Sequence, residues 1–215
     1  MPWIEQLRSA NWGEAGCICL AAYLLGCCTT GYYLVRWRTG QDIRDLGSGS
    51  VGGRNVGRVL GWKGFLATMV GDFAKGALAV WAARCFTNDD RLAVLAVPAV
   101  VAGHVWPAQL HFRGGKGMAA SVGALLVHDY QLALVFVLLF AAAVAALRKT
   151  VLPSLLAMAC LPLTAMCLGR GPAAVLGVSV LAGLVLLAHR RNLAAELSHF
   201  LESRNVHPKH APPDL

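Results

Sequence analysis

Two glycine-rich, basic stretches carry the residue types in this chain that are best suited to holding a phosphate group. The first runs from Gly47 to Arg58 with the sequence GSGSVGGRNVGR, and the second from Phe112 to Gly117 with the sequence FRGGKG. Glycine leaves backbone N–H groups unhindered, and together with fixed Arg and Lys charges they can converge on one anion. Both stretches lie between long apolar runs. We therefore expect a phosphorylated substrate to be handled at a membrane surface.

The composition is that of a membrane protein. Of the 215 residues, 57% are hydrophobic and only 14% are charged, whereas soluble domains have about 25% charged residues. The 19 Lys and Arg exceed the 11 Asp and Glu, which gives a net charge of +8. The basic residues lie in short loops beside apolar runs, and no polar face is large enough to bind nucleic acid. We predict an all-α, polytopic membrane protein in which residues 1–215 form one domain. We expect it to contact membrane lipid and not to bind nucleic acid.

Seven apolar segments predict about seven transmembrane helices, because backbone in lipid must satisfy its own hydrogen bonds. The segments are 16–35, 61–83, 92–110, 117–128, 130–147, 151–168 and 173–189. Most of them approach the roughly 20 residues that a helix needs to cross a bilayer. Segment 117–128 is too short, so we expect a half-spanning or re-entrant helix, or a helix that merges with its neighbours. The polar tail at about 203–215 is expected to be frayed.

The distribution of Lys and Arg predicts the orientation of these helices. Fourteen of the 19 lie in the odd-numbered loops or the C-terminal tail, four lie on the opposite side, and Lys75 lies within a helix. Because cytoplasmic loops carry the excess of positive charge, the N-terminus should be outside and the C-terminus in the cytoplasm. Both glycine-rich stretches then face the cytoplasm.

Two familiar nucleotide-binding motifs are incomplete in this chain. The glycines Gly47, Gly49 and Gly52 have the spacing of a dinucleotide fingerprint, but no strand precedes them and no acidic residue follows in a βαβ unit. Gly115 and Lys116 lack the Ser or Thr and the upstream glycine of a Walker A loop. The seven cysteines lack Cys-x-x-Cys spacing, and we interpret them as small packing residues.

A set of polar residues on the expected cytoplasmic side remains. It comprises Ser48, Arg54, Asn55 and Arg58 on the first loop, Arg113 and Lys116 on the third, Ser154 beyond the fifth, and His189, Arg190 and Asn192 at the end of the last helix. The positive-inside rule alone explains any single cation. The rule does not explain the glycine-flanked Ser, Asn and His residues that accompany these cations. The group as a whole therefore favours a functional site. Asp72 and Lys75, three residues apart in an apolar segment, form either a structural ion pair or a functional one.

The order and spacing of these residues resemble the bacterial membrane acyl-phosphate:glycerol-3-phosphate acyltransferases (PlsY). The matching segments are Asp42-Ile-Arg-x-x-Gly-Ser-Gly49 with Asn55-Val-x-Arg58, Asp72-Phe-Ala-Lys-Gly76, Gly103-His-x-x-Pro107 with Phe112-Arg-Gly-Gly-Lys-Gly117, and Ser154 with His189-Arg-x-Asn192. The resemblance extends from Tyr23 to Asn192, which is nearly the whole chain.

The resemblance implies an enzyme that transfers an acyl group from acyl phosphate to glycerol 3-phosphate in phospholipid biosynthesis. It further implies lysophosphatidic acid as the product, no metal or bound cofactor, and a site on the cytoplasmic face of the bacterial inner membrane. The implied catalytic residues are Ser48, Arg58, Lys116, His189 and Asn192; the implied phosphate- or substrate-binding residues are Gly47, Gly49, Gly52, Asn55, Gly114, Gly115, Gly117 and Ser154; Asp72, Lys75 and His104 are implied in supporting roles.

The chain departs from the family at Ser50, Gly53, Arg54 and Val151, and Arg54 adds a charge beside the expected phosphate site. No His is followed five positions later by Asp, so the His-x4-Asp pair of many glycerolipid acyltransferases is absent. We expect the acceptor's own phosphate to take the proton from its hydroxyl, with His189 as the alternative base. Two other classes stay open: a transporter of a phosphorylated solute and a non-catalytic, diverged relative. The sequence does not specify the oligomeric state.

Overall fold

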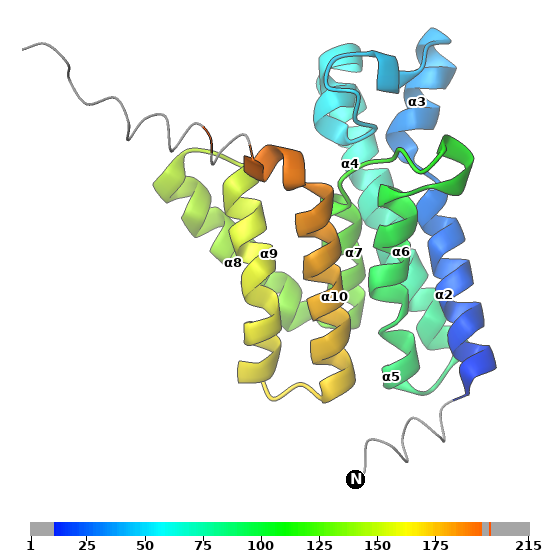
Figure 1. The fold of residues 1–215 in the computed structure, drawn as a ribbon, viewed down its shortest axis with the longest axis vertical. Coiled ribbons are helices and arrows are strands. Elements are labelled where there is room, and N and C mark those ends of the chain that lie inside the picture. The colour runs from blue at the N-terminus through cyan, green and yellow to red at the C-terminus, as the bar shows by residue number, and fades with distance from the viewer. Residues whose placement is uncertain (1–10, 195–197, 199–215) are drawn as a thin grey trace, which may run out of the picture.

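The computed structural model describes residues 11–194 and Ser198, and every regular element in that part of the chain is a helix (Figure 1). The prediction of an all-α fold is confirmed. The elements are α2 (Trp12–Cys27), α3 (Thr30–Thr39), η1 (Ile43–Asp45), α4 (Gly53–Phe86), α5 (Asp90–Ala93), α6 (Ala96–Val105), η2 (Ala108–Leu110), α7 (Met118–His128), α8 (Tyr130–Leu147), α9 (Val151–Cys167) and α10 (Pro172–Ala188).

Several predicted segments are interrupted in the structure. The first apolar segment is divided into α2 and α3 by a break at Cys28 and Thr29, and segment 92–110 is divided into α5, α6 and η2. The short segment 117–128 is a separate helix, α7, and does not merge with α8. Asp129 separates them, because its side chain accepts hydrogen bonds from the N–H groups of Gln131 and Leu132 and so begins α8.

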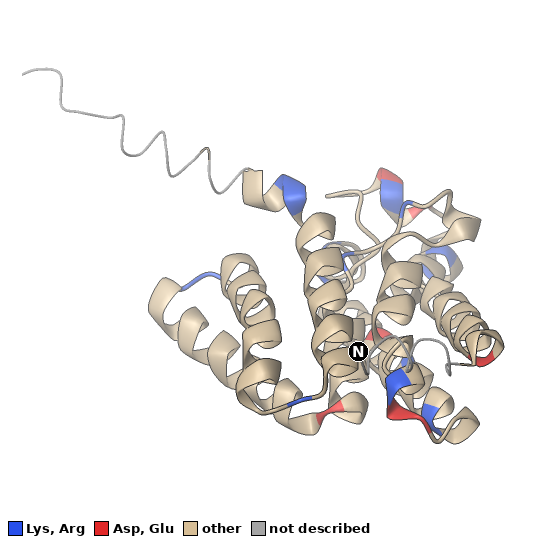
Figure 2. Ribbon diagram, turned by 60° about the horizontal axis from the view of Figure 1, so that its bottom comes forward, with Lys and Arg blue, Asp and Glu red and all other residues tan. Residues whose placement is uncertain are grey.

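The helices have the length and composition of membrane spans. Four helical stretches are long and apolar enough to cross a bilayer, at 12–39, 53–86, 90–110 and 130–147, and three shorter apolar helices occupy 118–128, 151–167 and 172–188. Charged residues lie mostly toward the helix ends and in the connections (Figure 2), and Asp72 and Lys75 in the middle of α4 are an exception. The protein is therefore an all-helical membrane protein, and the count of seven spans stays a prediction.

The first eight residues of α4 fold back on the rest of that helix. Gly61 has a φ of 71° and a ψ of −170°, which interrupts the helix in a conformation essentially restricted to glycine. A Cβ on Gly57 would lie 3.1 Å from Cβ of Phe65, and one on Gly53 would lie 3.1 Å from Cγ of Met69. Such contacts require residues 53–60 to run back along 62–69. The N-terminus of α4, with buried Gly53, consequently lies against Phe65 and Met69 of the same helix.

Two glycine-mediated contacts hold the bundle together below this fold-back. A Cβ on Gly103 of α6 would lie 2.0 Å from the Tyr23 carbonyl oxygen of α2, and one on Gly123 of α7 would lie 2.0 Å from the Phe73 carbonyl oxygen of α4. Backbones at this distance leave no space for a side chain. A separate small core of Val35, Ile43, Val51, Val56 and Leu110 holds the segments 40–52 and 106–117 above the bundle.

Both glycine-rich stretches lie at one end of the bundle. The connections 40–52 and 106–117, the α8–α9 connection and the end of α10 are all at the upper end in Figure 1. These are the described members of the group of Lys- and Arg-rich loops that the sequence assigns to the cytoplasm. The predicted frayed tail, with Arg204 and Lys209, lies outside the described residues.

Candidate active site

The loop at residues 40–52 is shaped around the side chain of Asn55. The Asn55 amide nitrogen donates to the carbonyl oxygens of Leu46 and Ser50, both at 2.9 Å, and its oxygen accepts from the N–H of Ser48 at 2.9 Å. Asn55 is 1% exposed. Both of its amide hydrogens are thus used within the loop, and direct binding of substrate by Asn55 stays a prediction. It lies on α4 and positions the loop.

Positive φ angles let the first glycine-rich loop close around Asn55. Gly47 and Gly49 have φ angles of 56° and 69°, and a Cβ on Gly47 would lie 2.3 Å from the Asn55 side-chain oxygen. The N–H of Gly49 donates to the Leu46 carbonyl, and that of Gly52 donates to the Ser50 hydroxyl. These two N–H groups are therefore engaged in the loop itself and are not presented to a phosphate.

The second glycine-rich stretch packs against the end of α6. The N–H of Gly114 donates to the Val105 carbonyl at 3.1 Å, and that of Gly115 donates to the His104 carbonyl at 3.0 Å. In the structure the carbonyl groups at the end of α6 accept both N–H groups, and phosphate binding by Gly114 and Gly115 stays a prediction. Gly117 has a φ of 80° and forms the N-cap of α7. These glycines bring the backbone close to α6 and place Lys116 between two helix ends.

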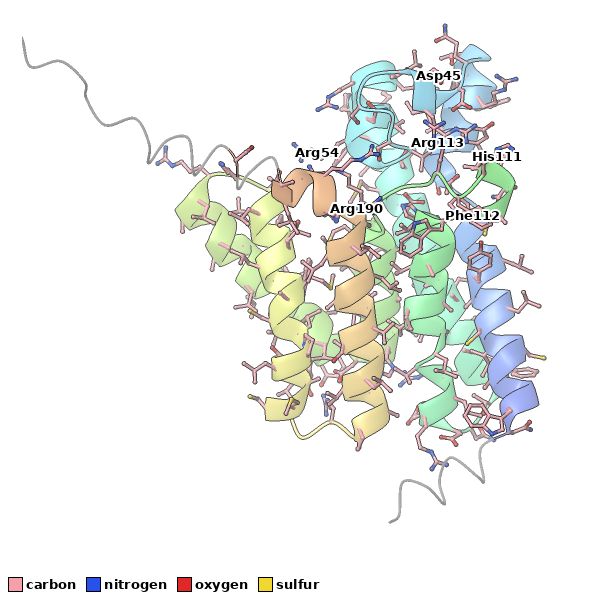
Figure 3. All side chains as sticks on the ribbon, viewed as in Figure 1. Asp45, Arg54, His111, Phe112, Arg113 and Arg190 are labelled. Atoms are coloured by element: carbon pink, nitrogen blue, oxygen red, sulfur yellow. The ribbon has the colours of Figure 1, made fainter. Side chains whose placement is uncertain are left out.

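Lys116 is the point at which three separate parts of the chain meet. Its ammonium donates a hydrogen bond to the side-chain oxygen of Asn192, just beyond α10. Burial lowers the pKa of Lys116, and the nearby charge of Arg54 lowers it further. Figure 3 shows Arg54 and Arg190 at this same end of the bundle. The structure thus brings together Lys116 and Asn192, as the sequence predicted, and it adds Arg54.

His189 lies beside this group at the end of α10, where it is 5% exposed. Its Nδ1 is 2.8 Å from the Val185 carbonyl oxygen, which can only accept, so Nδ1 carries the hydrogen and Nε2 has a free electron pair. Burial lowers the pKa of His189, its bond to Val185 opposes that shift, and the charge of Lys116 lowers the pKa further. The imidazole is therefore neutral near pH 7 and accepts at Nε2.

The remaining predicted residues lie at the same end, and among the described residues no hydrogen bond or ion pair joins them to Lys116. Ser48 is exposed on the 40–52 loop. Arg58 is exposed one turn after Arg54, on the same face of residues 53–60. Ser154 is buried in the first turn of α9 and donates to the Val151 carbonyl at 2.7 Å. Arg54, Asn55 and Arg58 were predicted on a loop, but all three lie on α4.

Arg44 links segment 40–52 to segment 106–117, a role that was not predicted from the sequence. Its guanidinium donates to the carbonyl oxygen of Leu110 at 2.8 Å and to the Asp42 carboxylate at 2.6 Å. These hydrogen bonds hold the pKa of Asp42 below its usual range. Gln109 makes a similar link, since its side-chain nitrogen donates to the Cys27 carbonyl at the α2–α3 break. The charge alternation in Asp42-Ile-Arg44 was the one available signal.

A buried polar cluster lies directly below the second segment. Asp72 and Lys75 form an ion pair of 3.0 Å, which confirms the predicted pairing, and the ring of His104 lies 2.8 Å from the Lys75 ammonium. The three side chains are 3–6% exposed. No group of three metal-ligating side chains was found within the described residues.

These features define a class of protein: a helical membrane protein with glycine-shaped loops and a group of cations at one end of its bundle. Known proteins identify the family. Residues 16–199 match the family model for glycerol-3-phosphate acyltransferase. The chain is 43% identical to glycerol-3-phosphate acyltransferase 1 of Desulfitobacterium hafniense (strain Y51), over 89% of this chain and 96% of that protein. It is 40% identical to the glycerol-3-phosphate acyltransferase of Clostridioides difficile (strain 630), over 82% of this chain and 88% of that protein.

A solved structure agrees with this match. The crystal structure of PlsY (YgiH), an integral membrane glycerol 3-phosphate acyltransferase in its glycerol 3-phosphate form, superposes with a TM-score of 0.78 at 30% identity, covering 86% of this chain and 92% of that one. This chain belongs to the glycerol-3-phosphate acyltransferase family and is a membrane acyltransferase.

Proposed function

We propose that this protein transfers an acyl group from acyl phosphate to the hydroxyl of glycerol 3-phosphate and releases lysophosphatidic acid and inorganic phosphate. Membership of the family supports the acceptor and the reaction type. The observation that carries the proposal is the convergence of Lys116, Arg54, His189 and Asn192 at one end of the bundle. Both proposed substrates bear phosphate groups, and this end presents cations to them.

The phosphate groups are held by the start of α4 and by the cations around it. Asn55 makes the first helical hydrogen bond to Gly52, so the N–H groups of Gly53 and Arg54 have no partner in the helix. A helix N-terminus of this kind favours an anion. The fold-back at Gly61 turns it back along the same helix, while Arg54 and Lys116 supply charge. Ser48, Arg58 and Ser154 complete the site as contacts to the acceptor or the donor.

The chemistry is an attack by the acceptor hydroxyl on the acyl carbon. The new ester C–O bond forms, the bond between the acyl carbon and the phosphate oxygen breaks, and the departing phosphate leaves with that electron pair. Lys116 and Arg54 stabilise the negative charge on the acyl oxygen and on the leaving phosphate, the electrostatic contribution that is usually largest. His189 accepts the hydrogen bond of the hydroxyl at Nε2 and orients it, and the acceptor's own phosphate takes the proton.

The acyl chain of the donor extends along a groove between α4 and α7. This open, apolar groove of about 670 Å³ is lined by Phe73, Ala77, Leu78, Trp81 and Val127. Its lining residue on α7, Val127, lies about three helical turns beyond Lys116, so the groove would hold the distal part of the chain. A second apolar cavity of about 320 Å³ lies between α2 and α4 and is lined by residues such as Ile18, Leu25, Ala79 and Phe86.

The site faces the cytoplasm in the proposed orientation. The connections at its end of the bundle hold most of the Lys and Arg residues, and positive charge is retained on the cytoplasmic side. The protein is proposed to lie in the bacterial inner membrane, where its product enters phospholipid biosynthesis.

Purified protein in detergent, supplied with acyl phosphate and labelled glycerol 3-phosphate, tests the proposal. We expect labelled lysophosphatidic acid and an equal amount of inorganic phosphate. Acyl-CoA and acyl carrier protein thioesters serve as comparison donors, and product from a thioester alone would overturn the acyl phosphate assignment. Protein in sealed vesicles separates the other classes: accumulation of unmodified glycerol 3-phosphate would indicate a transporter, and neither product nor uptake would indicate a non-catalytic relative.

A further inference from the structure

We propose that Asp72, Lys75 and His104 are positioning residues that hold Lys116 in the active site; this rests on the function proposed above. Their polar groups are buried inside the bundle. Charges in such surroundings are tolerated only when they are paired and hydrogen-bonded. Lys75 meets that condition through its ion pair with Asp72 and its hydrogen bonds, while the Asp72 carboxylate is held by the ion pair. The contacts of the three side chains lead from the break in α2–α3 to the residue before Lys116.

The Lys75 ammonium is the centre of the cluster. It lies 3.0 Å from the Asp72 carboxylate, 2.8 Å from Nδ1 of His104, and 3.1 and 3.0 Å from the carbonyl oxygens of Gly26 and Cys28. An ammonium can only donate, so Nδ1 of His104 accepts and Nε2 carries the hydrogen. Helix α4 thereby fixes both the orientation and the tautomer of a ring on α6, while binding the carbonyls that are exposed where α2 ends.

The far side of the His104 ring rests on Gly115. A Cβ on Gly115 would lie 2.1 Å from Nε2, which no side chain could occupy without moving the ring. The N–H of Gly115 also donates to the His104 carbonyl at 3.0 Å. Lys116 follows directly and reaches Asn192. A displacement of the His104 ring would therefore move Gly115 and, with it, the adjacent Lys116, whose ammonium is proposed to bind the phosphate.

If Asp72 and Lys75 formed only a structural ion pair, the contact between the His104 ring and Gly115 would have no effect on turnover. The two roles separate in a pair of compensating substitutions. Gly115→Ala introduces the Cβ that collides with Nε2. His104→Asn places an amide oxygen near the position of Nδ1, where Lys75 can still donate to it, but leaves the space of Nε2 empty. The double variant restores contact, because the alanine methyl group fills that space.

The experiment measures kcat, KM for glycerol 3-phosphate and the melting temperature for the two single variants and the double variant. Because a displacement of about 1 Å in an active site costs on the order of 100-fold in rate, each single variant should lose about that factor in kcat with little change in KM or melting temperature. The double variant should recover about tenfold over Gly115→Ala, as coupled residues in contact do. Multiplied losses without recovery, or a fully active His104→Asn, would overturn the proposal.

Two further measurements test the inference if the first variants fold poorly or if the enzyme uses a donor other than acyl phosphate. Asp72→Asn combined with Lys75→Met removes both charges together, so no unpaired charge is left buried. Because the hydrogen bonds of Lys75 to Gly26 and Cys28 are also lost, the melting temperature should fall while the protein stays folded at the assay temperature, where kcat should be about tenfold lower. Wild-type kcat in this folded variant would contradict the anchoring role. The rate at which an amine-acylating reagent modifies Lys116, read by mass spectrometry against exposed Lys63, needs no turnover. It should rise several-fold in both single variants; an unchanged rate would sink the inference even if the proposed reaction were correct.

Discussion

Replacing Lys116 with methionine is the most direct test of the anion site. The substitution keeps most of the apolar stem and removes only the ammonium, which in the structure is half-buried and bonded to Asn192. A hydrogen bond to a charged group contributes about 1.5–3 kcal/mol, and the loss of that much transition-state stabilisation slows a reaction by roughly 10- to 150-fold. We expect kcat/KM to fall within this range, because the partly buried charge is screened less than an exposed one.

The assay follows release of inorganic phosphate and formation of labelled lysophosphatidic acid over a range of both substrates. Lys63→Met is the matched control, since Lys63 lies on α4 just beyond the fold-back and its side chain is exposed. The control should keep wild-type kinetics, and both variants should keep the wild-type melting temperature.

Near-normal kcat/KM in Lys116→Met would refute the reasoning. Lys116 would then be a cation that serves only the positive-inside rule, and its contact with Asn192 would be a packing feature. An equal loss in Lys63→Met would refute it differently, by showing that the general positive field of this end, and not a located charge, supports the reaction.

The other predictions concern charge, chain length and orientation. Arg54→Thr removes a charge that lowers the pKa of Lys116; because Lys116 must be protonated to hold phosphate, the alkaline limb of the pH–rate profile should move to higher pH, and KM for glycerol 3-phosphate should rise. Ala77→Phe narrows the α4–α7 groove and should shift preference toward shorter acyl chains, whereas exposed Ala142→Phe on α8 should not. Periplasmic alkaline phosphatase fused after residue 194 should be inactive, and fused at Gly169 it should be active.

The helices and the end of the bundle at which the site lies were largely predictable from the sequence. Apolar runs can form only helices in lipid, and the alternation of connections between two ends follows from their order. Lys116 and Asn192 were likewise placed together by the family resemblance, and the structure bonds them directly. These inferences depend on residue type and order alone, which a sequence states without ambiguity.

Features that depend on contacts between distant residues were not predictable. Asn55 could have bound phosphate or backbone, and only the closed loop shows that the backbone uses both of its amide hydrogens. The break after Cys27 is stabilised by Lys75 and Gln109, which lie far along the chain and leave no local signal. Gly61 resembles any glycine in an apolar run, and its backbone reversal requires residues 53–60 to pack on the following turns.

The packing below the site also bears on the rival classes. A transporter must open a passage from the site to the other face of the membrane, and such passages form between helices that can separate. Beneath the proposed anion site, α2 and α6 approach so closely at Gly103 that a Cβ would lie 2.0 Å from a backbone oxygen, and α4 and α7 do the same at Gly123. The Lys75 ammonium ties α2, α4 and α6 together at the same level. Opening this layer would break a buried charge cluster and two backbone-to-backbone contacts at once, so the geometry favours chemistry at one face over transport between two.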